Sequence, residues 1–344
     1  MITITPTKIS DYIFCAYKYW LTIQRPKIKV PQSPEAVVGA GLHMAINRSL
    51  YRIVDMPKAR QKRIEKGEAT EYFYKTLRGF ISFSAGLLAE ILKGENGIHR
   101  QIRDKRPIKW PKDISPKDLK DLKEKYLLTA LWMAKEYYIK NQDKPAPFLR
   151  EKKLRYPLAE EIRSGVSLVG IIDQVRKNSQ GQIYIADLKT GFDPFDYVFR
   201  KTEGDVVVPL TRLYINYQLS TYWYLFSKYY GEPHMAALYY LKTGQIYLTH
   251  RTEEQIQQLF EVISRMLEAL EKEDFRPTGL EANHCRYCDY SDVCKPYSQV
   301  PGVRPRTIDE IEEGFPDTVR LKQELEQVLQ GSINYRPRLK LKKR

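Results

Sequence analysis

Two short apolar segments, residues 166–176 and 182–190, place acidic side chains on neighbouring β-strands. An Asn-Ser-Gln-Gly run separates them, which is typical of a hairpin turn. With a three-residue loop at 179–181 and its glycine in the left-handed region, Asp173 lies opposite Asp187. This register constrains the fold more than any other feature of the chain, because it brings two negative charges together inside a sheet.

Facing carboxylates destabilise a sheet unless something offsets their repulsion. A divalent cation between Asp173 and Asp187 would do so, and carboxylate oxygens suit Mg²⁺ or Mn²⁺. Strand alternation puts Lys189 on the same face as Asp187 and Leu188 on the other face. A cation held there could activate a water molecule, and Lys189 could orient that water or stabilise charge on a phosphate. The competing interpretation is two solvent-facing strand ends and a surface lysine.

The charge of the chain favours a polyanionic partner. Its 344 residues include 57 Lys and Arg against 42 Asp and Glu, a formal net charge of +15. Nucleic acid is the commonest partner for such an excess, although a merely basic protein shows it too. We expect no signal peptide, no membrane span and no membrane partner, and therefore a cytoplasmic protein, or a nuclear one in a eukaryote.

The four cysteines form a potential metal-binding set. Cys285, Cys288 and Cys294 are close in sequence, and Cys15 is remote from them. In a reducing compartment such cysteines are more typical of metal ligands or free thiols than of disulfides. Four thiolates suit either structural zinc or an iron–sulfur cluster, and one remote cysteine with a close triplet is less typical of zinc, whose ribbons usually show two close pairs.

The remaining pattern predicts an α/β fold with a mixed sheet. Helices are expected over 8–24, from near Glu35 past Leu50, over most of 58–145, over 214–230 and over 252–272, and further strands over 235–242 and 245–250. The last nine residues carry six Lys or Arg and no acid, which predicts a disordered tail.

The hairpin resembles the core of the PD-(D/E)xK nucleases in their RecB-like form. Gly170-Ile171-Ile172-Asp173 is followed on the next strand by Asp187-Leu188-Lys189-Thr190-Gly191. The resemblance implies a restriction-endonuclease-like mixed β-sheet core flanked by helices. It also implies that the two aspartates bind the catalytic metal and that the lysine is catalytic.

Two further motifs extend the resemblance. Gly39-Ala40-Gly41-Leu42-His43 matches a helix motif whose histidine is a metal ligand, and Gln218 with Tyr222 matches a Gln-x-x-x-Tyr motif that positions substrate or the lysine. The four-residue spacing places the last two on one helical face. Alone, each would more often be a structural residue, so the joint order carries the argument.

The cysteines are similar to the [4Fe–4S] clasp of RecB-like nucleases, such as the AddB nuclease domain and CRISPR-associated exonucleases. Ala16 departs from that pattern, where a proline often follows the first cysteine. The resemblance implies a nuclease domain over 1–300 with a clasp that includes 285–294. It does not cover residues 52–145, which the sequence pattern predicts to be a helical insertion, or the C-terminal extension at 301–344.

The implied activity is an Mg²⁺- or Mn²⁺-dependent DNA exonuclease acting on single strands or free ends. The expected partners are DNA and a helicase or CRISPR-adaptation protein, and the setting is repair, recombination or CRISPR adaptation. Two alternatives remain open: a non-catalytic DNA-binding subunit that keeps the cluster, and a nuclease directed at RNA.

Overall fold

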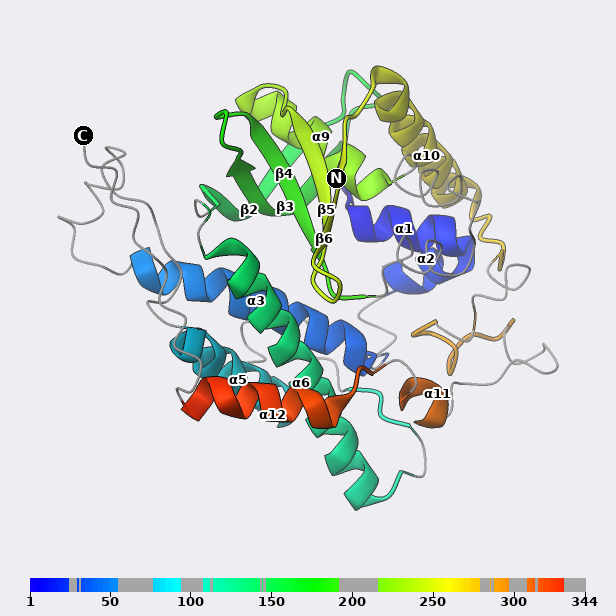
Figure 1. The fold of residues 1–344 in the computed structure, drawn as a ribbon. Helices are drawn as coiled ribbons and strands as arrows, with labels where there is room; N and C mark the ends of the chain where they lie inside the picture. The colour runs from blue at the N-terminus through cyan, green and yellow to red at the C-terminus, as the bar shows by residue number, and fades with distance from the viewer. Residues whose placement is uncertain are drawn as a thin grey trace, which may run out of the picture.

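A mixed β-sheet separates two groups of helices in the computed structural model (Figure 1). The structure describes residues 1–24, 30, 32–54, 77–93, 108–111, 114–142, 144, 147–191, 216–278, 285, 288–296, 308–312 and 315–330. Within these ranges, no helix combines the length and the apolar character that a bilayer crossing requires.

The sheet has the order β1-β3-β4-β5-β6. β2 also pairs with β3, along the edge of β3 opposite to the one that pairs with β4. β1 pairs with β3 and β4 pairs with β5 in parallel, and the other pairs are antiparallel. The strands are β1 (Ile2–Ile4), β2 (Leu149–Pro157), β3 (Val166–Lys177), β4 (Ile183–Lys189), β5 (Met235–Tyr240) and β6 (Gln245–Thr249). The expected α/β fold with a mixed sheet is therefore confirmed.

The β3–β4 hairpin has the register expected from its turn. Gln174 pairs with Ala186 and Val175 pairs with Ile185, and one further step of this register aligns Asp173 with Asp187. Gly181 has a φ of +81°, in the left-handed region that a three-residue hairpin loop requires. A loop one residue longer or shorter would have moved one carboxylate to the opposite face.

The regular alternation of β3 is interrupted where Asp173 projects. Ile172 and Val175 both pack into the same core, although three positions separate them. On β2, Glu151 lies between the residues that pair with Gln174 and Ile172, and its φ is +45°. A positive φ is rare outside glycine, so the two strands share a local irregularity beside the acidic residue.

One hydrophobic core lies between the sheet and helices α1 (Pro6–Phe14), α2 (Ala16–Ile23), α9 (Tyr217–Tyr230) and α10 (Glu253–Lys272). It combines buried strand residues such as Ile172 with Trp223 and Phe226 of α9. α9 is capped by the Asn216 side chain, and α10 by a capping box of Thr252 and Gln255. These caps account for the helix starts near the expected positions.

A second core lies in a helical layer below the sheet in Figure 1. Leu188 and Tyr239 of the sheet pack into this layer. Its helices are α3 (Pro34–Val54), α5 (Leu77–Lys93), α6 (Pro116–Asn141) and α12 (Thr318–Gln330), and a short helix α11 (Ile308–Glu312) precedes α12. The expected helical insertion at 52–145 thus contains the end of α3 and all of α5 and α6, and residues 55–76, 94–107, 112–113, 143 and 145 lie outside the described residues.

The C-terminal extension includes a helix that belongs to this second core. Leu325 and Val328 of α12 are buried there, and Glu324 forms an ion pair with Lys135 of α6 at 2.5 Å. Residues 331–344, which include the expected disordered tail, lie outside the described residues.

The expectation of one helix over residues 8–24 was wrong. The Thr5 side chain caps the first helix, and Cys15 interrupts the segment with an extended backbone at φ −169° and ψ 119°. The chain resumes as α2 at Ala16. Helical periodicity continues on both sides of Cys15, so the sequence pattern did not reveal this break.

Two glycines allow helices to approach the hairpin closely. A Cβ atom on Gly39 of α3 would lie 2.7 Å from Thr190 Oγ1, just after β4. A Cβ atom on Gly170 of β3 would lie 2.9 Å from Leu225 Cδ1 and 3.1 Å from the Tyr222 ring. Both separations are too short for ordinary contacts, so the missing side chains set how near α3 and α9 lie to the sheet.

Gly39→Ala is therefore expected to destabilise the protein by about 1–3 kcal/mol through overpacking against Thr190. Truncating the opposing side chain, in the double variant Gly39→Ala/Thr190→Ala, should restore most of that loss. Denaturant unfolding of the four proteins in this cycle gives the coupling. Purely additive effects of the two changes would contradict close contact between α3 and the end of β4.

Candidate active site

Asp173 lies at the irregular part of β3 and is held there by contacts from β4 and α3. Its Oδ2 atom accepts a hydrogen bond from the backbone amide of Leu188 at 2.9 Å and lies 3.4 Å from Nδ1 of His43 on α3. Burial alone would raise the pKa of Asp173, but the His43 charge and the hydrogen bonds outweigh it and lower that pKa. Asp173 is thus stabilised as a carboxylate.

Asp187 on β4 is more deeply buried, with its side chain 2% exposed. Burial, together with the nearby charge of Asp173, raises its pKa despite the opposing charge of Lys189. Its Oδ1 accepts a hydrogen bond from Gln218 Nε2 at 2.8 Å. Oδ2 lies 2.6 Å from Lys189 Nζ as an ion pair, but it accepts no hydrogen bond of acceptable angle.

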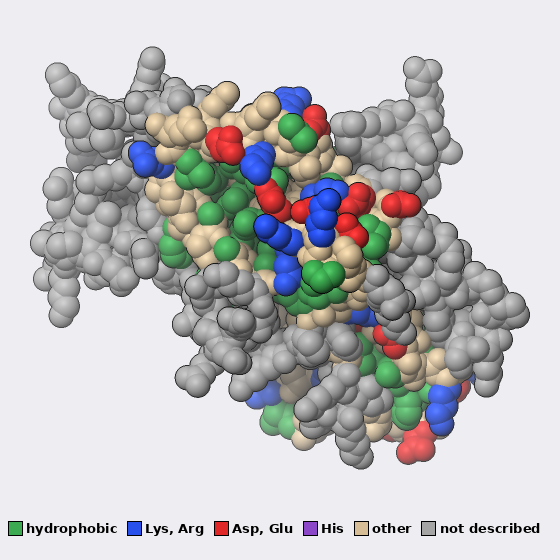
Figure 2. Space-filling model, turned by 90° about the horizontal axis from the view of Figure 1, so that it is seen from below, with side chains coloured by type: hydrophobic (Ala, Val, Ile, Leu, Met, Phe, Trp, Pro, Cys, Tyr) green, Lys and Arg blue, Asp and Glu red, His purple; other side chains and the backbone are tan. Residues whose placement is uncertain are grey.

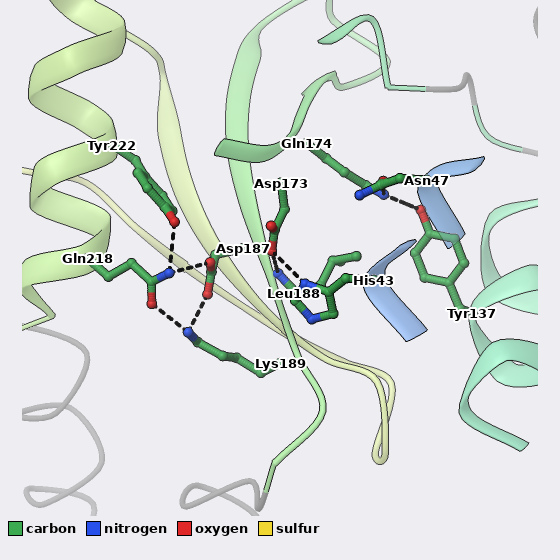
Figure 3. A network of polar contacts seen from close by, with 10 residues as sticks. All are labelled: His43, Asn47, Tyr137, Asp173, Gln174, Asp187, Leu188, Lys189, Gln218 and Tyr222. Atoms are coloured by element: carbon green, nitrogen blue, oxygen red, sulfur yellow. Dashed lines mark hydrogen bonds and ion pairs between the residues drawn. The ribbon is translucent and has the colours of Figure 1, made fainter. Parts of the chain in front are cut away.

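Gln218 connects the lysine, the second acid and a tyrosine (Figure 3). Its Oε1 accepts from Lys189 Nζ at 2.6 Å, and its Nε2 donates to Asp187 and, at 2.9 Å, to the hydroxyl of Tyr222. The lysine can only donate, which fixes the orientation of the amide. Burial, then the charges of Asp187 and Asp173, raise the pKa of Tyr222, so its hydroxyl keeps its proton.

The structure therefore places all six predicted site residues in one constellation. Asp187 and Lys189 project together, and Leu188 packs on the other face, as strand alternation predicted. Figure 3 shows His43, from α3, on the Asp173 side, and Gln218 and Tyr222, from α9, on the Asp187 side. The sheet thus presents two carboxylates between side chains from two helices.

A hard divalent cation fits the chemistry of this donor set. Asp187 Oδ2 is buried and accepts no hydrogen bond of acceptable angle, so beside its ion pair with Lys189 it has lone-pair capacity left for a cation. A bridging cation would also favour the ionised form of both acids. As arranged, Lys189 and His43 balance the charges, and across the described ranges no three His, Cys, Asp or Glu side chains are positioned to hold a metal ion.

A buried polar network next to the site was not anticipated from the sequence. Gln174, which follows Asp173, donates to the Tyr137 hydroxyl at 2.8 Å and to Asn47 Oδ1 at 3.4 Å (Figure 3). Asn47 lies one helical turn after His43 on α3. The network therefore ties β3 and α6 to the helix that carries the histidine, and the four-residue spacing of His43 and Asn47 was its only visible signal.

The four cysteines line a single pocket between the two ends of the chain, together with side chains that include Phe14, Tyr17, Lys18 and Pro277. Burial raises the pKa of Cys288 to about 11. Burial, then the charges of Cys15 and Cys294, also raise the pKa of Cys285. A cationic centre would favour the thiolate forms, which these surroundings otherwise oppose.

The helix break at Cys15 gives this residue its place in the pocket. Just after the break, the Tyr17 amide donates to the Arg276 carbonyl at 3.1 Å, and the Tyr19 ring packs against Phe275 with centroids 6.3 Å apart. These contacts hold α2 against the segment that follows α10. The remote cysteine and the C-terminal triplet are thereby brought together.

The comparisons with known proteins agree with this geometry. The family model of the PD-(D/E)XK nuclease superfamily matches residues 3–295. No curated protein matches the chain. A solved structure, "Crystal structure of SSO0001", aligns with 17% identity and a TM-score of 0.33 over 62% of this chain and 98% of that one, a likeness too weak to add to the assignment. Because the family model spans the sheet, the acidic pair and the cysteines, the chain belongs to the PD-(D/E)XK nuclease superfamily.

Proposed function

We propose that this protein is an Mg²⁺- or Mn²⁺-dependent deoxyribonuclease that hydrolyses phosphodiester bonds at the site built on β3 and β4. The observation that carries the proposal is the buried Asp187 Oδ2, which has no hydrogen bond and lies beside a second carboxylate and a lysine. Such a pair is unfavourable in a sheet without a function that uses it. Membership of a nuclease superfamily supports the same chemistry.

The roles that we assign rest on the sequence resemblance and are compatible with the contacts. Asp173, Asp187 and His43 would hold the cation, which would supply Lewis acidity and an activated water. Lys189, held 2.6 Å from both Gln218 Oε1 and Asp187 Oδ2, orients the water and stabilises charge on the phosphate. Gln218 fixes the position of the lysine.

Tyr222 supports this arrangement through Gln218. Its hydroxyl accepts the second Nε2 hydrogen bond of the amide, so the amide cannot turn without losing a buried bond. Gln218 and Tyr222 are therefore positioning residues. They fix the lysine through the amide rather than through contact with the reacting atoms.

We further propose that the cysteines bind a [4Fe–4S] cluster that fastens α2 to the C-terminal segment. The convergence of Cys15 with Cys285, Cys288 and Cys294 on one pocket supports this assignment. The cluster would stabilise the fold and would lie apart from hydrolysis, because its ligands share no residue with the acidic site. Structural zinc is the alternative outcome of the test below.

The finer assignment is a RecB-like exonuclease of the cytoplasm that acts on single strands or free ends. A helicase or CRISPR-adaptation protein would be its partner in repair, recombination or CRISPR adaptation. These assignments of activity, location, partner and pathway rest on the sequence resemblance of the hairpin, the helix motifs and the cysteines.

Asp187→Asn tests the catalytic assignment. It should lower the rate of Mn²⁺-dependent cleavage of labelled single-stranded DNA at least about 100-fold, because it removes a ligand charge without changing the shape of the side chain. Its free energy of unfolding should be unchanged or higher, since a repelling buried charge is lost. The exposed Asp309→Asn on α11 is the matched control. Equal cleavage by all three proteins would exclude catalysis at this site, and parallel RNA substrates test the alternative specificity.

The cluster assignment predicts brown, anaerobically purified protein with about four iron and four sulfide per chain and no zinc. Cys15→Ser should lose most of the iron and unfold at a lower denaturant concentration, since the ligand joins the two ends of the domain. Ser291→Ala changes the same pocket without removing a thiol and should keep the iron. A colourless wild-type protein with one zinc would contradict the iron–sulfur assignment.

A further inference from the structure

A row of basic side chains follows the outer edge of β2, with Lys152 on the sheet face that buries Leu154, and Lys153 and Arg155, both exposed, on the opposite face. Within the described strands, β2 pairs only with β3, so its other edge is unpaired. Lys152 pairs with Ile172, next to Asp173, and Arg155 pairs with Val169, farther along β3. The strand therefore starts beside the acidic residues and runs outward from them.

The charges of this row are not neutralised by neighbouring acids. In the part of the chain that the structure describes, none of Lys152, Lys153 and Arg155 forms an ion pair with a carboxylate. Arg155 instead donates to the Thr3 hydroxyl at 3.0 Å. The single acid of the strand, Glu151, lies at the irregularity opposite Asp173.

Several cations of the helical layer are instead paired with carboxylates. Lys125 pairs with Glu312 at 2.6 Å, and Lys322 pairs with Glu124 at 2.8 Å. On the face shown in Figure 2, Lys and Arg side chains likewise lie among Asp and Glu side chains. The β2 edge therefore carries three cations, close together along one strand, without a paired carboxylate, which favours contact with a polyanion.

The basic row ends beside two exposed aromatic rings. Tyr229 and Tyr230, at the end of α9, are 52% and 46% exposed. The Tyr229 ring meets Tyr156 of β2 edge-on at 6.4 Å between centroids, and its hydroxyl donates to the Arg155 carbonyl. The Tyr229 ring is thus held against the strand that carries the cations, and the Tyr230 ring lies beside it with 6.3 Å between centroids, with much of both rings open to solvent.

The same helix joins these rings to the site. Gln218 lies near the start of α9 and Tyr229 near its end, so about 17 Å of helix separates them at about 1.5 Å per residue. The segment from Lys152 to Arg155 covers about 10 Å of β2, which packs beside α9. Cations and then aromatic rings therefore extend outward from the acidic pair on two packed elements.

We propose that Lys152, Lys153, Arg155, Tyr229 and Tyr230 form a guide surface for one nucleic-acid strand whose other part occupies the active site. The cations would contact successive phosphates, and the rings would stack on unpaired bases. A single strand fits better than a duplex, because bases in a duplex are stacked on one another and cannot cover the tyrosines. This inference rests on the proposed nuclease function.

Edge protection is the competing explanation for part of this surface, because lysines on an edge strand also prevent strand pairing between molecules. It accounts for Lys152 and Lys153 but gives no reason for two exposed tyrosines beside them. The two explanations differ in what removal of the charges does: one predicts weaker binding of nucleic acid, and the other predicts self-association.

The test measures fluorescence anisotropy of labelled oligothymidylates of increasing length, in chelator and at several salt concentrations, so that no cleavage occurs. Lys152→Gln/Lys153→Gln should weaken binding and reduce the slope of log affinity against log salt by about 1.4, because about 0.7 is lost for each phosphate contact. Tyr229→Leu/Tyr230→Leu should weaken binding of the longer oligonucleotides about 10-fold or more with an unchanged salt slope.

Two matched controls should bind as the wild type does. Lys117→Gln/Lys120→Gln removes the same charge from exposed residues at the start of α6, at the end of the helical layer far from the sheet (Figure 1). Tyr229→Phe/Tyr230→Phe keeps both rings and removes only their hydroxyls. Size-exclusion chromatography of every variant measures self-association in parallel.

The guide surface is rejected if the β2 and tyrosine variants bind normally, if the α6 control loses as much affinity, or if the lysine variant self-associates without loss of binding. Mn²⁺-dependent cleavage by the wild type is measured separately. Cleavage with normal binding by the variants would overturn the guide surface alone. Variant-sensitive binding without cleavage would overturn the proposed hydrolysis and leave the guide surface standing.

Discussion

The repulsion between two carboxylates on adjacent strands is the constraint that the surroundings of the site must satisfy. Asp173 is stabilised by a backbone amide and His43, whereas Asp187 relies on Lys189 and Gln218. These partners come from β4 and from two helices on opposite sides of the sheet. The arrangement can persist only while α3 and α9 stay packed against the sheet, so the geometry of the site depends on the packing of the whole domain.

Two glycines allow these helices to pack closely against the sheet, because a larger side chain at either position would be too near its neighbour. Gly39 lets α3 approach the end of β4, and Gly170 lets α9 bring Tyr222 against β3. The buried Gln174–Tyr137–Asn47 network then fixes α3 from the other side. Glycines and buried amides therefore explain how residues far apart in sequence reach hydrogen-bond distance of two adjacent strands.

The cysteine pocket between α2 and the segment after α10 is a separate feature with a separate physical basis. Cys15 leaves the helical path, and α2 packs against the segment after α10, so the four thiols share a pocket. The acidic pair depends on one register of the β3–β4 hairpin, whereas the cysteine pocket depends on the packing of α2 against the segment that follows α10.

The sequence alone determined the hairpin register, the shared face of Asp187 and Lys189, and the helices that carry His43 and Gln218, because local turn geometry and strand alternation control these features. It gave no sign of the break at Cys15 or of the Leu188 amide that binds Asp173, since any residue supplies an amide and helical periodicity continues through the break. Only the tertiary structure decided the positions of α3 and α9 against the sheet and the buried amide network. Those contacts join distant segments, and the spacing of these segments depends on the packing of the complete core.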